Sequence, residues 1–212
     1  MTIDFYLDPA CPWCWSTSRW LIAVQPHRGF DIRWQPFSLW RKNKDTTPAE
    51  QVDALFATHR LLRICEAVRE SAGNDGVGRF YTVIGTAFHH DGLRVFSIGD
   101  ALSAAACDPS LAAASEDTTW DAMIAAQMDE GLALTGDDVG TPILGFDGKA
   151  AIFGPIISPM PTGESALVLF DAVVTLTSMA GFWELKRTRT VKPQFLDRPA
   201  VPHLDGEVNP VS

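Results

Sequence analysis

The segment Cys11-Pro12-Trp13-Cys14 constrains the fold more than any other feature of this chain. It directly follows a short apolar run, Ile3 to Leu7, and directly precedes a segment with helical periodicity. Two cysteines separated by two residues can close a small disulfide ring. At the first turn of a helix, unpaired N–H groups and the positive end of the helix dipole stabilise a thiolate on the outer sulfur. The pattern therefore predicts a redox-active cysteine pair.

Two other interpretations of the pair stay open: half of a zinc site, or two thiols without a special role. A zinc site needs two further ligands at metal-like spacing. The remaining candidates are Cys65, Cys107 and the adjacent His89-His90, and all of them are far from the motif in sequence. Cys65 lies in an apolar helical pattern and is expected to be buried, and Cys107 is expected in a loop or at a helix end. We expect no metal ligand in this chain.

Length and charge exclude several classes of protein. A chain of 212 residues can bury a sizeable core without disulfides. No apolar run approaches the ~18 residues of a membrane span, and the start Met1-Thr2-Ile3-Asp4 lacks the basic segment of a signal peptide. We therefore expect a cytoplasmic protein, a compartment in which a vicinal cysteine pair is more often catalytic than structural. The net charge of -9 argues against a nucleic-acid surface.

The first 35 residues predict a strand-helix-strand unit. Ile3 to Leu7 is rich in strand formers, and Asp8-Pro9-Ala10 is a turn that ends it. Pro12 suits the first helical position, and the helix is expected to stop at Pro26 to Gly29. Apolar and polar residues alternate from Phe30 to Gln35, which is typical of a half-buried strand. This strand is expected to run parallel to the first.

The next segment, from Thr47-Pro48 to about Leu134, has helical periodicity and predicts an insertion. Glycine-rich breaks are expected at Ala72 to Gly78 and at Gly92 to Gly99. The expected helices are Pro48 to Glu70, Arg79 to His89, Asp100 to Ala106, Ser110 to Ser115 and Thr119 to Leu134.

The sheet is expected to resume after the insertion. Ile143 to Phe146, a turn at Asp147-Gly148, and Ala150 to Phe153 predict a hairpin, and Gly163 to Met179 predicts a last amphipathic helix. The role of Phe182 to Thr190 stays open. The predicted organisation is a discontinuous α/β domain at 1–46 and 135–190, a helical insertion at 47–134, and an extended tail at 191–212.

The Thr141-Pro142 pair predicts the second half of an active site. A proline that opens a central strand cannot donate to the strand ladder, so it serves another purpose. A cis bond would let Thr141 present its N–H and C=O to an incoming chain. An ordinary turn proline is the alternative, but the presence of C-P-W-C in the same chain favours the cis bond.

The order of the two cysteines predicts their roles. Cys11 is the outer residue and is expected to be the nucleophile, while Cys14 would attack the mixed disulfide and release the reduced product. Asp8 either caps the turn or opposes thiolate formation, and the turn role is the simpler one. Trp13 must lie near the sulfur. Other aromatic residues are more typical of a core than of a pocket; these are Trp15, Trp34, Trp40, Phe80 and Phe88.

Several motifs together resemble a known family. They are Asp8 to Cys14, Pro36 to Leu39, Val139 to Pro142, Phe153 to Pro155 and Glu184 to Thr190. The chain resembles the cytosolic DsbA-type proteins with a helical insertion, and most closely the mycothiol-dependent nitroreductase group. The resemblance implies a thioredoxin-like fold with a large helical insertion and reduction of disulfides or nitro compounds in a pocket between two domains. It implies mycothiol as thiol co-substrate and no tightly bound cofactor.

The expected thiol-binding and substrate-binding residues are Pro12, Trp13, Thr141, Pro142 and, by the resemblance, Asn43. The expected partners are a low-molecular-weight thiol and a small electrophile or disulfide, with no nucleic acid or membrane, in a monomer or homodimer. Two alternatives stay open: a kappa-class-like thiol transferase or isomerase without redox turnover, and a non-catalytic zinc or protein-binding module. The basic run Lys186 to Arg189 is either a solvated surface or a contact to a carboxylate of a thiol cofactor.

Overall fold

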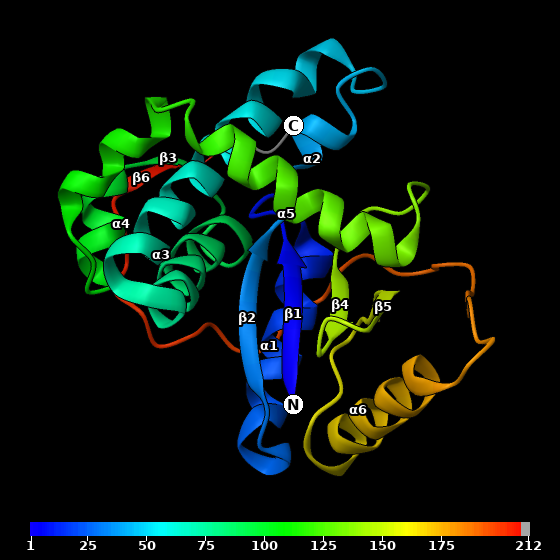
Figure 1. The fold of residues 1–212 in the computed structure, drawn as a ribbon. Coiled ribbons are helices and arrows are strands. Elements are labelled where there is room, and N and C mark those ends of the chain that lie inside the picture. The colour runs from blue at the N-terminus through cyan, green and yellow to red at the C-terminus, as the bar shows by residue number, and fades with distance from the viewer. Residues whose placement is uncertain (209–212) are drawn as a thin grey trace.

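A mixed four-stranded sheet lies at the centre of the structure, a computed structural model that describes residues 1–208 (Figure 1). The strand order is β2-β1-β4-β5. β1 (Thr2–Leu7) pairs in parallel with β2 (Asp31–Pro36) and antiparallel with β4 (Ile143–Phe146), which pairs antiparallel with β5 (Ala150–Phe153). β1 and β4 are buried on both faces, as expected of central strands. The predicted α/β class and the hairpin at Asp147-Gly148 are confirmed.

Helices cover the sheet on both faces. α1 (Pro12–Arg28) connects the parallel strands β1 and β2, begins at Pro12 as predicted, and ends at Gly29, which adopts a left-handed φ of 62°. α6 (Gly163–Ser178) packs beside α1. On the opposite face, α5 (Trp120–Thr135) crosses in front of the sheet and contacts β2, β4 and β5 (Figure 1).

The two helices predicted at the start of the insertion form one kinked element. α3 spans Ala49–His89, and its backbone leaves helical geometry at Gly73, where φ is 70° and ψ is -175°, so the break predicted at 72–78 is a kink at one residue. Gly78 is helical and has another use. A Cβ atom there would lie 2.6 Å from the indole nitrogen of Trp34. Glycine in this stretch therefore both kinks the helix, at position 73, and permits close packing, at position 78.

Shorter elements flank α3. α2 (Leu39–Lys42) precedes it, just before the insertion, and α4 (Ile98–Ala104) follows it. The helix predicted at 110–115 is a 3-10 helix, η1, over Pro109–Glu116. No helix within residues 1–208 combines the length and hydrophobicity of a membrane span.

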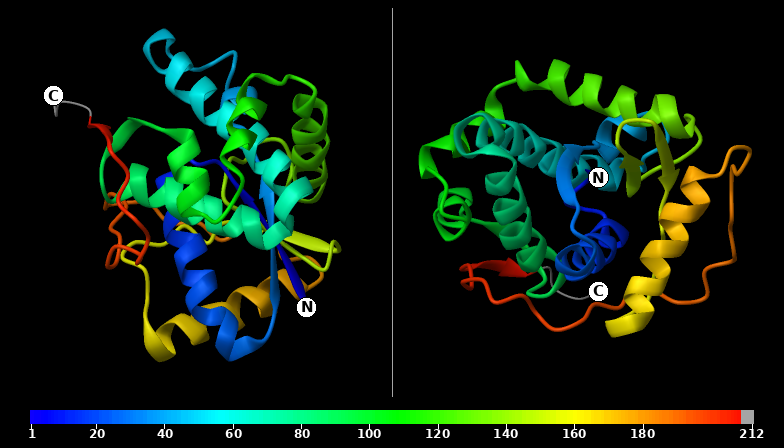
Figure 2. Two further views of the ribbon diagram at one scale, coloured as in Figure 1. Left: turned by 90° about the vertical axis from the view of Figure 1, so that its left-hand side faces the viewer. Right: turned by 60° about the horizontal axis from the view of Figure 1, so that its bottom comes forward.

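The segment predicted as an extended tail has no helix over residues 191–208, and its end folds back onto the insertion. β6 (Gly206–Val208) pairs antiparallel with β3 (Leu93–Phe96), which lies inside the stretch predicted as a glycine-rich break. Arg198 secures the return by a bidentate ion pair with Asp91, with nitrogen–oxygen distances of 2.8 and 2.9 Å. Figure 2 shows this segment, orange to red, running past α1 toward the insertion. Residues 209–212 of the predicted tail lie outside the described residues.

One core joins the sheet, α1 and the insertion. Trp15 of α1 is fully buried, and its ring contacts α3 at Gly85, where a Cβ atom would lie 2.3 Å from Cζ3 of the indole. The two helices can approach this closely only because position 85 has no side chain.

Gly85→Ala is therefore expected to destabilise the protein, although alanine gains about 1 kcal/mol of helix propensity. Forcing a methyl group against the buried Trp15 ring costs about 1–3 kcal/mol, because the ring or the helix must shift. We expect a lower midpoint of urea unfolding. Gly99→Ala in α4 is the matched control, since its Cβ would meet atoms only at 3.8 Å or beyond. An unchanged or raised midpoint for Gly85→Ala would contradict the packing described here.

Candidate functional site

The two motif cysteines lie at the N-terminus of α1. Cys11 is the N-cap residue, and its Sγ accepts a hydrogen bond from the backbone N–H of Cys14 at 3.4 Å. Both residues are free thiols. Cys11 is 6% exposed and Cys14 is fully buried, so Cys11 is the sulfur that an incoming molecule reaches first.

The loop before β4 faces both sulfurs, and its Thr141–Pro142 peptide bond is cis. The Cys11 thiol lies 3.5 Å from the carbonyl oxygen of Thr141, and the Cys14 Sγ lies 2.9 Å from Thr141 Oγ1. Thr141 Oγ1 also donates its proton to the Tyr6 carbonyl at 2.8 Å. Thr141 therefore fixes the loop to β1 and places its hydroxyl beside the Cys14 sulfur.

The two thiols are shifted in opposite directions. A hydrogen bond from the Cys14 side chain is the largest cause that lowers the pKa of Cys11, assisted by the Cys14 backbone N–H. Burial is the largest cause that raises the pKa of Cys14 well above its ordinary value, and the charge of Cys11 raises it further. The surroundings therefore favour the thiolate form at Cys11, the more exposed of the two sulfurs, and the thiol form at Cys14.

Asp8 is more than a turn residue. It is fully buried, and its carboxylate accepts hydrogen bonds from the backbone N–H groups of Ala10 and Leu39, both at 2.8 Å. Burial raises the pKa of Asp8 to about 6. Its charge also raises the pKa of Cys11, against the larger lowering effects. Asp8 therefore both caps the turn and opposes the thiolate.

Of the other predicted site residues, Trp13 and Pro12 lie at the cysteine motif, whereas Asn43 lies at the end of α2. Trp13 is half-buried between the cysteines, and the guanidinium carbon of Arg189 lies 5.5 Å from the centre of its ring. The basic run thus contributes one cation to the motif. Pro12 occupies the first position of α1. Asn43 ends α2, and its carbonyl accepts the N–H groups of Thr46 and Thr47. A role of Asn43 in holding a thiol stays a prediction.

Sequence reasoning considered His89 only as a metal ligand, but the structure places it against the motif turn. His89 Nε2 lies 3.0 Å from the carbonyl oxygen of Pro9. A carbonyl only accepts, so this nitrogen carries the proton, and burial lowers the pKa of His89 to about 4. His89 is thus a neutral donor that fixes the turn before Cys11. Its position at the C-terminus of a long helix gave no local signal for this contact.

Three of the five aromatic residues predicted to lie in the core are buried. Trp15, Trp34 and Phe80 are buried, while Trp40 and Phe88 are half-buried at the surface of the insertion. Cys65 and Cys107 are both buried. Within residues 1–208, no group of three or more His, Cys, Asp or Glu side chains has an arrangement that could hold a metal ion.

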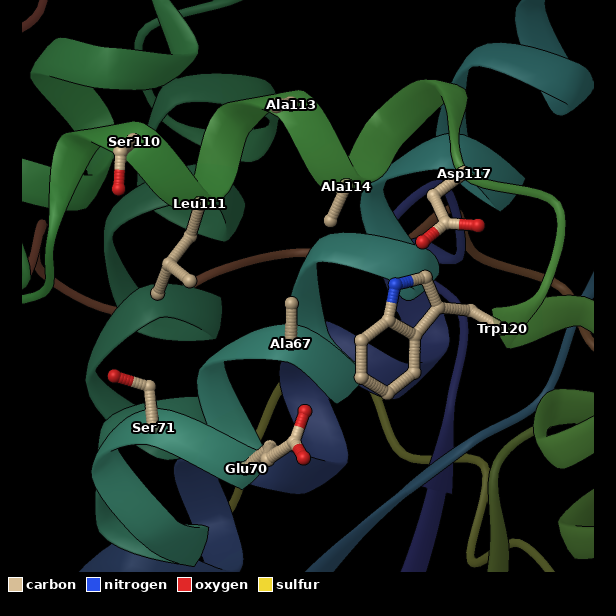
Figure 3. A pocket seen from close by; sticks show the side chains of 9 residues that line it. All are labelled: Ala67, Glu70, Ser71, Ser110, Leu111, Ala113, Ala114, Asp117 and Trp120. Carbon is tan, nitrogen blue, oxygen red and sulfur yellow. The ribbon is translucent and has the colours of Figure 1, made fainter.

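A separate cavity of about 630 Å³ opens inside the insertion (Figure 3). Its walls come from α3, η1 and the start of α5, with Trp120 on one side and Leu111 on another. These elements do not include the N-terminus of α1, so the cavity is not where a thiol would meet Cys11.

Comparison with known proteins identifies relatives across most of the chain. The family model described as Rv2466c-like, mycothiol-dependent nitroreductase Rv2466c, matches residues 10–187. The protein Rv2286c of Mycobacterium tuberculosis, named as uncharacterized, is 28% identical over 214 residues, which cover 97% of this chain and 90% of that protein.

Three solved structures share the fold at low sequence identity. The cytosolic disulfide reductase DsbM from Pseudomonas aeruginosa, solved with GSH, has a TM-score of 0.55 at 15% identity, over 83% of this chain and 100% of that one. A 2-hydroxychromene-2-carboxylate isomerase has a TM-score of 0.57 at 15% identity, over 82% and 95%. The probable DsbA oxidoreductase SCO1869 from Streptomyces coelicolor has a TM-score of 0.51 at 16% identity, over 90% and 94%.

These likenesses agree with the architecture described above: a thioredoxin-like fold of the DsbA type that carries a helical insertion. The family match spans the cysteine motif, the insertion and the loop before β4. The chain therefore belongs to the Rv2466c-like family of mycothiol-dependent nitroreductases.

Proposed function

We propose that this protein is a thiol-disulfide oxidoreductase that takes electrons from mycothiol and passes them to a disulfide or a nitro compound. The observation that carries the proposal is the pair of opposite pKa shifts at the N-terminus of α1: lowered for the accessible Cys11 and raised for the buried Cys14. A reductase dithiol needs this asymmetry, because one sulfur must attack the substrate as a thiolate while the other stays protonated until the mixed disulfide has formed.

The first step uses the Cys11 thiolate. It attacks one sulfur of a substrate disulfide, forms a mixed disulfide with that sulfur, and expels the other half as a thiolate that takes a proton from water. The Thr141 carbonyl, 3.5 Å from Cys11 Sγ, borders the position that the substrate chain would occupy. Trp13 offers a half-buried ring for an apolar or aromatic part of the substrate.

The second step uses Cys14, and the first step prepares it. The charge of Cys11 is one cause of the raised pKa of Cys14, and this charge disappears when Cys11 enters the mixed disulfide. The pKa of Cys14 then falls. Its thiolate attacks Cys11 Sγ, forms the Cys11–Cys14 disulfide and releases the second half of the substrate as a thiol. Two electrons have moved from the protein to the substrate.

Two mycothiol molecules would restore the dithiol. One forms a mixed disulfide with Cys11 and releases Cys14, and the second releases Cys11 and leaves as mycothiol disulfide. A nitro substrate would take the same two electrons with two protons, giving a nitroso compound and water. Arg189 near Trp13 and Asn43 at the end of α2 are the polar side chains that we assign to thiol binding.

The isomerase neighbour supports a second candidate, a thiol transferase or isomerase that holds a thiol without redox turnover. Such an enzyme would need one cysteine at most. The presence of Cys14, 2.9 Å from Thr141 Oγ1 and able to reach Cys11, favours the two-cysteine reaction. The two candidates differ in what they require of Cys14, and this difference decides between them.

Cys11→Ser is expected to abolish mycothiol-dependent reduction of a model disulfide, whereas Cys14→Ser should stop after the first step. Incubated with oxidised mycothiol, Cys14→Ser should accumulate a mixed disulfide on Cys11, detectable as an added mass that a reductant removes. Glutathione and cysteine disulfides, run in parallel, report which thiol is preferred. Cys107→Ala is the control, because Cys107 is a buried thiol of the insertion. Full turnover by Cys14→Ser would contradict the redox cycle and favour the transferase.

Asp8→Asn is expected to lower the pKa of Cys11, because the charge of Asp8 raises it in the native protein. The carboxyl group is ionised above pH 6, so the effect appears at neutral pH. The ultraviolet absorbance of the thiolate, followed against pH in a Cys14→Ser background, measures the change. Asp31→Asn, at an exposed position, makes the same charge change as a control. A raised or unchanged pKa in Asp8→Asn would contradict the electrostatic role.

Asp8 should also make the stability depend on pH. The pKa of Asp8 is about 6 in the folded protein and 3.8 for an aspartate in the unfolded chain, so the folded protein binds the proton more tightly. This contribution is complete well below pH 3.8 and is lost as the pH rises through 6, by roughly 3 kcal/mol in total. The difference in unfolding free energy between wild type and Asp8→Asn, from urea titrations at several pH values, should fall by about 2 kcal/mol between pH 4 and 7. A difference that is flat with pH would remove Asp8 as its source.

A further inference from the structure

The segment between α6 and the returning tail, residues 183–192, lies in solvent along its whole length. All of its residues are exposed, and it contains no helix, strand or turn. Trp183 is 89% exposed and Leu185 is 77% exposed, more than any other large apolar side chain of the described chain. Residues two apart lie on the same side of an extended chain, and exposed apolar surface that is grouped in this way marks an interaction site.

The backbone of this segment is also unpaired. Among residues 1–208, no hydrogen bond involves a backbone N–H or C=O group of residues 183–191, and the Lys192 carbonyl accepts only from Ser158 Oγ, at 2.9 Å. A chain without turns whose backbone groups are free can pair with a second extended chain, as the edge strand of a sheet does. The segment thus offers backbone groups as well as apolar side chains to a partner.

The charge of the segment is opposite to that of the whole protein. It contains four cations and one carboxylate, a formal charge of +3, in a chain whose net charge is -9; the cations are Lys186, Arg187, Arg189 and Lys192. The ion pairs formed within residues 1–208 use other cations. These four charges are therefore available to an acidic partner, which the rest of the acidic protein would repel.

One end of the segment reaches the cysteine motif. The guanidinium carbon of Arg189 lies 5.5 Å from the centre of the Trp13 ring, and Trp13 stands between the two cysteines in the sequence. Figure 1 shows the segment, in orange, leading from the end of α6 back toward the sheet. An extended chain rises about 3.3 Å per residue, so Trp183 lies up to about 20 Å along the segment from Arg189. A partner that follows the segment would therefore have one end beside Cys11.

We propose that residues 183–192 dock an extended acidic segment of a protein that carries the substrate disulfide. The proposal rests on the proposed function, since it names the class of disulfide that Cys11 attacks. Acidic side chains next to the partner's cysteine would lie against Arg187 and Arg189, and an apolar side chain about four to six residues away would lie against Leu185 and Trp183. A protein fits better than a nucleic acid, because the net charge of -9 repels a long polyanion outside this segment.

Three peptide disulfides and one small disulfide test the docking. The parent peptide has one central cysteine, two glutamates on either side and a phenylalanine at either end, and two copies are joined as a symmetric disulfide. A second peptide has lysines in place of the glutamates, and a third has alanines in place of the phenylalanines. Bis(hydroxyethyl) disulfide is small and uncharged, so it measures the chemistry without docking.

With mycothiol as reductant and at low salt, kcat/KM of the wild-type protein for the parent peptide is expected to exceed that for the lysine peptide by at least about tenfold, mainly through KM. Added salt should reduce the difference, because the charges lie in solvent. The alanine-ended peptide should lose about threefold relative to the parent, since it lacks the apolar contact.

Two variants and one control locate the docking segment. Arg187→Glu should lower kcat/KM for the parent peptide by about tenfold and raise it for the lysine peptide. Trp183→Ala should lower it about threefold for the parent but not for the alanine-ended peptide. Both variants should reduce bis(hydroxyethyl) disulfide as wild type does. Lys149→Glu makes the same charge change in the β4–β5 turn, at the opposite end of the sheet from Cys11, and should match wild type throughout.

Binding is also measured without chemistry, by the fluorescence anisotropy of dye-labelled peptides in which serine replaces the cysteine. The glutamate peptide should bind more tightly than the lysine peptide, and Arg187→Glu should remove the difference. If the peptides bound in this way but wild type reduced no disulfide, the proposed function would fail, and the disulfide of the partner with it, whereas the acidic docking segment would be supported.

Three results would overturn the docking proposal. One is equal kcat/KM and equal binding for the glutamate and lysine peptides together with normal reduction of bis(hydroxyethyl) disulfide, which leaves the proposed function intact. Another is a monomer–dimer equilibrium in sedimentation that Arg187→Glu abolishes, which would assign the segment to a second copy of this chain. The last is tighter binding of a single-stranded oligonucleotide than of the glutamate peptide at equal charge.

Discussion

The N-terminus of α1 sets the chemistry of this protein, and strand β1 sets the position of that terminus. β1 ends at Leu7, and the Asp8 turn then delivers Cys11 as the N-cap, where its sulfur accepts the Cys14 N–H. The same strand pairs with β4 through Tyr6 and Ile143, which brings Thr141 onto the Tyr6 carbonyl. One strand register therefore fixes both the cysteines and the loop that faces them, although the two are 130 residues apart.

The local parts of this arrangement could be predicted from the sequence, because each depends on neighbouring residues. Pro12 favours a helix start, and Asp147-Gly148 between two strand patterns favours a tight turn. The glycines of α3 could be interpreted only in part. The glycine-rich stretch does contain a kink, at Gly73, but the close contacts of Gly78 and Gly85 depend on Trp34 and Trp15, which come from other elements. The β3–β6 pair was missed for the same reason, because a three-residue strand carries too little pattern to suggest a distant partner.

The candidate site divides along the same line. Cys11, Cys14 and the Thr141-Pro142 pair follow from motifs, but their electrostatic surroundings do not. Asp8 has the sequence environment of an ordinary turn residue, and only the fold reveals that Leu39 and Ala10 enclose its carboxylate. The contact of Arg189 with Trp13 and that of His89 with Pro9 likewise join segments that are far apart in sequence. Motif residues thus supply the reacting atoms and most of the groups that shift their pKa values, whereas long-range packing supplies the burial and the Thr141 contact.

The first turn of α1 and the segment around Arg19 therefore have different roles. Its first turn stabilises a thiolate by N–H groups and the helix dipole, and both effects act only within about one turn. Arg19, further along, is not among the described groups that shift the pKa of Cys11. Its guanidinium carbon lies 4.2 Å from the centre of the Trp15 ring and 5.8 Å from that of the Tyr81 ring, and its Nη1 donates to Thr82 of α3. Arg19 therefore holds α1 against α3, whereas the first turn of the same helix sets the ionisation of Cys11.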